Sequence, residues 1–154
     1  MNVEKRLSEL GYTLPVPQGP KASYIVVRRS GPFIFTAGMS AFAGDELKYR
    51  GKLGRELGVK EGYESARLTA LNLLSVLKQE LGDLDEVKGI VKLLVFINCT
   101  EDFSEHPAVA NGASDLFREV FGDKGAHARS AVGANSLPMN CSVEIEMIVE
   151  VGDA

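Results

Sequence analysis

Two residues of this sequence combine reactive side chains with a spacing that could place them in one site. Arg129 lies in a short β-type segment, and Glu144 follows it after a Leu137-Pro138 turn, so a hairpin would bring the two segments together. A guanidinium is planar, stays charged and can donate two parallel hydrogen bonds to a carboxylate. A glutamate carboxyl can move a proton or polarise a water. Each residue alone has a simpler interpretation, because charged residues on strands most often face solvent.

The cysteines and histidines form no metal-binding or redox pattern. Cys99 and Cys141 are not in a C-x-x-C pair, and His106 and His127 lack the spacing of zinc ligands. We therefore expect no metal site. Both cysteines are predicted to be free thiols that fill small buried positions in strands, with a catalytic thiol as the alternative.

The first sixty residues are predicted to form a short helix, a linker, a hairpin and a long loop. Apolar residues at helical spacing predict a helix over 2–10, and the prolines and glycine of 14–20 rule out regular structure there. Two β-rich segments, 24–29 and 33–38, flank a Ser-Gly-Pro turn and predict a β-hairpin. The glycine-rich, charged segment 41–59 is interpreted as a long loop with one short strand.

The middle of the chain carries the clearest elements. Apolar residues at three- and four-residue spacing mark one face of a helix over 60–81. Residues 87–98 are almost continuously apolar or β-branched, which predicts a strand covered on both faces. A loop is expected over 100–109, and a second helix near 112–121 with Asn111 close to its start.

The last strand shows the most regular pattern. After a short strand over 127–133 and a turn, the apolar residues of 141–151 alternate with polar ones that include Glu144, Glu146 and Glu150. Strict alternation places one side of this strand on the core and the carboxylates on the other side.

The order of these elements predicts an α+β fold in which two helices pack on one face of a single mixed sheet. The helices leave the other sheet face uncovered, and the last strand makes that face partly polar. Packing it against copies of the chain in a closed ring is the natural solution, because soluble oligomers are usually symmetric.

Length and composition limit the number of domains, the kinds of partner and the cellular location to be expected. A chain of 154 residues, 45% hydrophobic and 25% charged, is expected to form one domain over 1–154, with 1–20 as a helix-and-linker extension. A net charge of −4 argues against nucleic acid as a partner, and the basic run within 48–55 is interpreted as a solvated loop. No apolar run is long enough to span a membrane and the charged start is not a secretory signal, so we expect a cytoplasmic protein.

Several segments between residues 20 and 151 follow one family pattern in order. The most specific is an arginine, Arg129, followed by Leu137-Pro138 and by the hydrophobic-Glu-hydrophobic-Glu strand Val143-Glu144-Ile145-Glu146. The others are Tyr24 at the first strand, Phe35-Thr36-Ala37-Gly38, Ala70-Leu71-Asn72-Leu73-Leu74, Leu84-Asp85-Glu86-Val87-Lys88, Val95-Phe96-Ile97-Asn98 and Asp102-Phe103. Taken together, they resemble the RidA/YjgF family. The first 20 residues and an insertion around 105–110 are absent from its shortest members.

The resemblance implies a chorismate-mutase-like fold and a homotrimer with clefts between subunits. It also implies hydrolysis of reactive 2-imino or enamino acids to 2-keto acids and ammonia, without metal or cofactor. An imine is already electrophilic, so positioning and modest proton transfer suffice. The partners expected are thus a small imino or keto acid and further copies of the chain.

The resemblance also assigns roles within the site. Arg129 would grip the substrate carboxylate, with the backbone N–H of Ala131 as a second donor. Glu144 would hold and polarise the attacking water or shuttle a proton.

Further positions complete the expected site. Tyr24 would close the cleft, Asn111 would contribute from the helix start, and Gly38 would line the substrate-binding side. Simpler interpretations are a strand-forming tyrosine and a helix-capping asparagine. The family uses neither His106 nor His127 as acid or base, although His127 is the better placed to touch a ligand.

The sequence departs from the best-studied deaminases of this family. They often carry a serine where Ala37 stands and a cysteine where Ala131 stands. Ala131 still offers its backbone N–H, so the departures affect substrate identity more than fold.

Other functions compete with deamination. The same cleft could sense a small carboxylate without catalysis, but binding alone would not need Glu144 beside Arg129. A ribonuclease or translation-inhibitor activity is disfavoured by the acidic composition and by the lack of interleaved basic and aromatic residues. Nothing in the sequence indicates a scaffold or chaperone.

Overall fold

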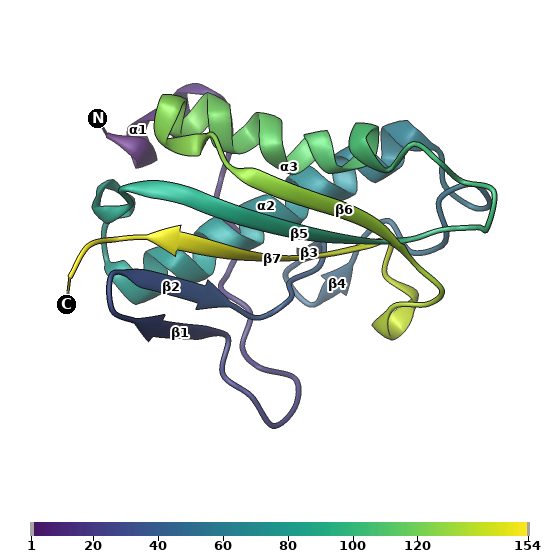
Figure 1. The fold of residues 1–154 in the computed structure, drawn as a ribbon, viewed down its shortest axis with the longest axis horizontal. Coiled ribbons are helices and arrows are strands. Elements are labelled where there is room, and N and C mark those ends of the chain that lie inside the picture. Colours follow the sequence, from purple (N-terminus) through teal and green to yellow (C-terminus); the bar gives the residue numbers. More distant parts are fainter. Residues whose placement is uncertain (1, 154) are drawn as a thin grey trace.

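The computed structural model describes residues 2–153 as a five-stranded sheet with helices on one face (Figure 1). The helices are α1 (Val3–Glu9), α2 (Val59–Leu81) and α3 (His106–Phe121). The strands are β1 (Val27–Ser30), β2 (Phe33–Thr36), β3 (Phe42–Ala43), β4 (Glu46–Leu47), β5 (Gly89–Asn98), β6 (Ala128–Ala134) and β7 (Val143–Glu150). Short 3₁₀ turns lie at Leu84–Glu86, Gly122–Gly125 and Pro138–Asn140. The α+β prediction of a mixed sheet with two main helices on one face is confirmed.

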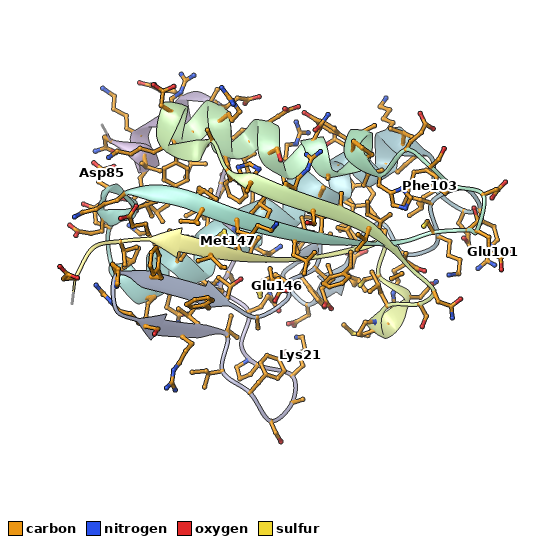
Figure 2. The ribbon with its side chains drawn as sticks, viewed as in Figure 1. Lys21, Asp85, Glu101, Phe103, Glu146 and Met147 are labelled. Carbon is orange, nitrogen blue, oxygen red and sulfur yellow. The ribbon has the colours of Figure 1, made fainter. Side chains whose placement is uncertain are left out.

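The N-terminal helix and the long helix α2 form as their apolar spacing predicts. Asn2 caps α1 by accepting a hydrogen bond from the Lys5 N–H at 2.7 Å. The Val3 N–H donates to Asp85, labelled in Figure 2, and ties the start of α1 to the turn before β5. α2 is buried on one side over its first turns and on all sides over residues 69–77, and it is capped by Gly82, whose φ of +81° suits glycine.

The second helix, α3, begins earlier than predicted. It starts at His106 instead of near residue 112, so residues 106–109 are helical and the expected loop is shorter. Pro107 lies in the first turn, where its missing N–H costs nothing, and Val109 already faces the core. Asn111 therefore lies inside the helix and is not its cap, and the expected insertion at 105–110 forms the first turn and more of α3.

The sheet has the order β1-β2-β7-β5-β6, and the structure corrects three predicted features of the strands. β6 and β7 do not form a hairpin, because the apolar strand β5 lies between them, parallel to β6 and antiparallel to β7. β1 begins at Val27, so Tyr24 lies before the strand and not in it. The predicted loop 41–59 contains a small hairpin, β3–β4, instead of one strand.

Helices cover only one of the two faces of the sheet. On the helix face, Val143, Ile145, Met147 and Val149 of β7 are buried against α2 and the rest of the core. The neighbouring residues Glu146 and Met147, both labelled in Figure 2, belong to opposite faces by strand alternation. We call the face without helices the open face. β5 is covered only on the helix face within one chain, which corrects the expectation of cover on both faces.

Candidate functional site

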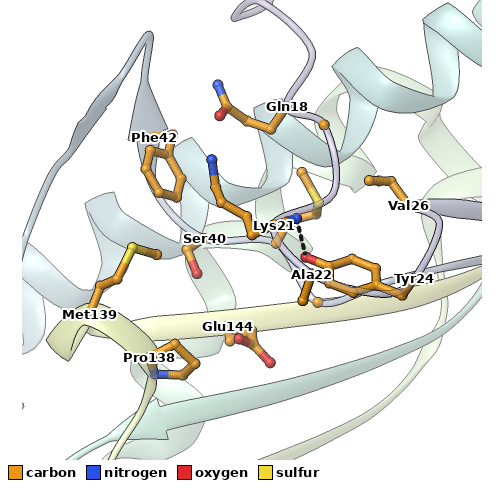
Figure 3. A pocket seen from close by; sticks show the side chains of 13 residues that line it. Gln18, Lys21, Ala22, Tyr24, Val26, Ser40, Phe42, Pro138, Met139 and Glu144 are labelled. Carbon is orange, nitrogen blue, oxygen red and sulfur yellow. Dashed lines mark hydrogen bonds between the residues drawn. The ribbon is translucent and has the colours of Figure 1, made fainter.

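A pocket of about 250 Å³ contains three of the predicted site residues: Tyr24, Gly38 and Glu144 (Figure 3). Its walls come from the segment that leads into β1, from the chain after β2, and from the Pro138–Asn140 turn. The other residues of the wall are Gln18, Gly19, Lys21, Ala22, Val26, Met39, Ser40, Phe42, Pro138 and Met139. Most of the surface of this wall is apolar, and its polar side chains besides Glu144 are Gln18, Lys21, Tyr24 and Ser40.

Gly38 makes room for the Glu144 side chain. A Cβ atom built on Gly38 would lie 2.5 Å from the Glu144 Oε2 and 2.8 Å from its Cγ. Residue Met39 pairs with Ile145, so the chain after β2 runs directly beside Glu144. Only glycine leaves this carboxyl in its present position.

The carboxyl of Glu144 lies in a partly dry environment. Burial raises its pKa above the usual value, and the nearby carboxylate of Glu146 raises it further. Such a carboxyl can exchange protons closer to neutrality than an exposed glutamate.

Tyr24 and Lys21 form the outer rim of the pocket. The Tyr24 hydroxyl accepts a hydrogen bond from the backbone N–H of Lys21 at 3.2 Å, as Figure 3 shows. The Tyr24 side chain remains 44% exposed. The Lys21 ammonium lies 4.7 Å from the centre of the Phe42 ring. The segment before β1 therefore shapes the mouth of the pocket.

The predicted carboxylate-binding residues form a second group, on β6 and α3. Arg129 donates to the Asn111 Oδ1 at 2.9 Å and to the Ser114 Oγ at 3.0 Å. Both partners lie on α3, which covers the helix face of the sheet. Asn111 thus orients the guanidinium from within the helix.

Ala131 presents its backbone at the free edge of the sheet. The Cys99 N–H lies 3.5 Å from the Ala134 carbonyl, so the polar backbone groups of Ala134 face β5. Successive residues of a strand turn these groups to alternate sides, so those of Ala131, three residues earlier, face away from β5. β6 is an edge strand, which leaves this N–H directed toward solvent or a neighbouring molecule.

The two groups lie on opposite faces of the sheet. Arg129 is in register with Leu93, which is fully buried on the helix face. Glu144 is in register with Phe96, which alternation places on the open face. A single chain therefore brings Tyr24, Gly38 and Glu144 together, and Arg129, Ala131 and Asn111 together, but does not join the two groups.

Sequence reasoning missed several residues of both groups. Ser114, which contacts Arg129, looked like an ordinary helix residue, although its spacing of three from Asn111 places both on one helix face. Met139 reaches the pocket from a left-handed backbone conformation (φ +57°) that no sequence signal indicated.

The remaining reactive residues are placed differently. Cys141 is buried and Cys99 half-buried, both as free thiols, and burial raises the pKa of each. Across residues 2–153, no three His, Cys, Asp or Glu side chains are grouped as metal ligands. Over the same range, no helix is both long and apolar enough to cross a membrane.

Comparisons with known proteins agree with the observed fold, and the matches cover most of the chain. A family model described as "YjgF/chorismate mutase-like, putative endoribonuclease" matches residues 4–151. Protein TCP17 of Trypanosoma cruzi is 41% identical over 152 residues, 98% of this chain and 95% of that protein.

Solved structures extend the same likeness. Atu1372 of Agrobacterium tumefaciens, a protein with unknown function, is 40% identical, with a TM-score of 0.91 over 97% of this chain and 92% of that one. RidA from the Antarctic bacterium Psychrobacter sp. PAMC 21119 shares the fold at 23% identity, with a TM-score of 0.60 over 90% of this chain and 96% of its own. The sheet, the helices and these matches together show that the chain belongs to the RidA/YjgF family, the YjgF/chorismate-mutase-like proteins.

Proposed function

We propose that this protein hydrolyses reactive 2-imino or enamino acids to 2-keto acids and ammonia, in clefts between the subunits of a homotrimer. The observation that carries the proposal is the division of the site residues between two faces. A carboxylate grip lies on β6 and α3, and an acid–base carboxyl lies in the pocket of the open face. Two copies of the chain, packed edge to face, can combine both groups in one cleft.

The open face has the character of a surface that is covered in an assembly. Phe35 and Val132 are both 42% exposed there, and Leu94, Phe96 and Ile148 of the neighbouring strands are only half-buried. Alternation and register place these side chains on the same face. A second copy laid against them would bury apolar surface that helices leave open.

The residues of the assembled cleft suit the chemistry. Arg129 and the Ala131 N–H would hold the carboxylate of the imino acid, with its C=N carbon toward the second subunit. With the imine nitrogen protonated, Glu144 would take one proton from water as the water oxygen bonds to the C=N carbon and the π electrons of the C=N bond move to nitrogen, which becomes an amine. Glu144 would return this proton to the amine, and the C–N bond would break to release ammonia while the Glu144 carboxylate takes the hydroxyl proton and the C=O bond forms. The raised pKa of Glu144 suits a group that must both accept and return a proton.

The direct test is the deamination of 2-iminobutanoate and 2-iminopropanoate, generated in the assay by an amino-acid oxidase or dehydratase. Wild type should accelerate ammonia release, and Arg129→Ala and Glu144→Gln should lose about 100-fold or more with their assembly intact. Arg6→Ala, at an exposed arginine of α1 outside the open face, is the matched control.

Two other outcomes would contradict deamination. Carboxylate binding with no acceleration would indicate a non-catalytic binding trimer. Cleavage of RNA by wild type, lost in the same variants, would instead support the endoribonuclease named in the family description.

A further inference from the structure

Arg129 belongs to a continuous chain of hydrogen bonds that runs beyond the predicted site. Its guanidinium donates to the Ser114 Oγ at 3.0 Å, and that oxygen lies 2.8 Å from the His127 Nε2. The His127 Nδ1 lies 2.6 Å from the Gly125 carbonyl oxygen. None of the proposed chemistry requires Ser114 or His127 directly.

The end of this chain fixes the positions of its protons. A carbonyl oxygen can only accept, so the His127 Nδ1 carries the hydrogen. In a neutral imidazole Nε2 must then accept, so the Ser114 hydroxyl donates to it. The lone pairs of Ser114 are left to accept from Arg129. Every donor in the chain meets an acceptor.

The surroundings hold the imidazole in this arrangement. A Cβ on Gly125 would lie 2.1 Å from the Phe117 carbonyl oxygen, so no larger residue fits where the accepting carbonyl stands. The Phe117 ring meets His127 edge-on, with centroids 6.2 Å apart. Burial is the main cause that lowers the pKa of His127, the Gly125 hydrogen bond partly opposes it, and the charges of Arg129 on β6 and Arg118 on α3 lower the pKa further. The lowered pKa favours the neutral imidazole near pH 7.

We propose that Ser114 and His127 are positioning residues: they hold the Arg129 guanidinium ready for a carboxylate ligand, and His127 senses whether that ligand is bound. The proposal rests on the proposed function only in taking a small carboxylate as the ligand. A bound carboxylate would add a negative charge beside Arg129 and so favour the charged imidazole. Ligand binding and protonation of His127 are then linked in both directions.

Binding of 2-oxobutanoate, the stable product, tests the positioning role without turnover. Ser114→Ala and His127→Gln should weaken binding about three- to tenfold, as the loss of one oriented hydrogen bond does. Ser114→Thr keeps the hydroxyl and should bind nearly as wild type does. Ser8→Ala, on the exposed side of α1, is the control for a helix serine far from this chain. In turnover, Ser114→Ala should raise KM and leave kcat nearly unchanged.

Imidazole NMR tests the sensing role. The protein has only two histidines, so His106 serves as an internal reference and His127→Gln assigns the signals. The free protein should show the Nδ1–H form of His127 near neutral pH, and saturation with 2-oxobutanoate should raise the pKa of His127 while leaving the imidazole chemical shifts of His106 unchanged. A purely structural role for His127 would not produce this shift.

The outcomes separate the inference from the proposed function. Wild-type affinity in Ser114→Ala and His127→Gln, or a His127 pKa indifferent to the ligand, would overturn the inference even if deamination is observed. Binding without deamination would overturn the proposed function alone, and the variants would still decide the inference. Failure of wild type to bind 2-oxobutanoate would overturn the inference, and the deamination assay would still decide the proposed function.

Discussion

At the scale of single residues, the contact with Glu144 explains why residue 38 is a glycine. From the sequence, Gly38 could be assigned to the site only by family resemblance. Gly38 was expected to line the substrate-binding side, and the structure supplies a physical reason for a glycine there. The chain needs this residue to have no side chain so that the Glu144 carboxyl can lie in the pocket. Such a close approach between distant segments has no local sequence signal.

Gly38→Ala should reduce kcat for 2-iminobutanoate about tenfold or more while the protein remains folded. The added methyl group displaces the end of the Glu144 side chain, which can rotate away at small cost in stability. Gly89→Ala is the control, since a Cβ there meets only the Lys124 carbonyl at 3.8 Å. Full activity in Gly38→Ala would show that the position of Glu144 does not matter for catalysis.

Glu144→Gln should be inactive and yet more stable than wild type at pH 7. Burial favours the neutral form of Glu144 in the folded state, so its folded pKa lies above its unfolded pKa. The folded state then binds more protons, and stability falls as pH rises between these two values. Urea unfolding at pH 7 and pH 4 should show the gain at pH 7 and its disappearance at pH 4. A loss of stability at pH 7 would mean that the carboxylate stabilises the fold.

At the scale of helices and strands, the spacing of apolar residues predicts an element correctly where tertiary contacts do not change its bounds or its pairing. The extent of α2 and the alternation of β7 follow directly from the spacing of their apolar residues. The start of α3 was missed because His106-Pro107 has no cap signal and no side-chain cap bond forms there. The predicted hairpin between β6 and β7 is wrong. The two strands are close in sequence, which suggested that they pair, but β5 lies between them and pairs with both.

The incorrect β6–β7 hairpin also led to an incorrect prediction of how the site residues are arranged. Arg129 and Glu144 were expected to face each other across a hairpin, and strand register instead assigns them to opposite faces. Sequence spacing indicates which residues matter but not the face to which a strand directs them once a third strand intervenes.

Gly112→Ala should destabilise the protein by about 3 kcal/mol or prevent folding, because α2 and α3 touch at this glycine. A Cβ there would lie 2.0 Å from the Tyr63 carbonyl oxygen, and the backbone of α2 cannot move aside as a side chain can. Urea unfolding, with Gly89→Ala as the control, measures the effect. A change below about 0.5 kcal/mol would show that the two helices separate easily.

At the scale of the whole molecule, the proposed trimer uses the open face as its interface. Phe35→Asp should therefore convert the proposed trimer to monomers and abolish the proposed deamination, because a charge in a buried interface without a partner is costly. Val16→Asp, at an apolar residue that is 70% exposed on the linker, should change neither property. Light scattering after size-exclusion chromatography measures the mass. An unchanged mass for Phe35→Asp would place the interface elsewhere.

Mixing two inactive variants tests most directly whether one site is built from two chains. Arg129→Ala and Glu144→Gln chains, each inactive alone, would be co-expressed with different tags and the mixed oligomers purified. If each site takes Arg129 from one chain and Glu144 from its neighbour, every mixed trimer restores both groups in one of its three clefts, whichever variant is in excess. The expected result is recovery of about a third of the wild-type rate. Mixed oligomers as inactive as the separate variants would contradict it, because that result requires both residues to act from the same chain.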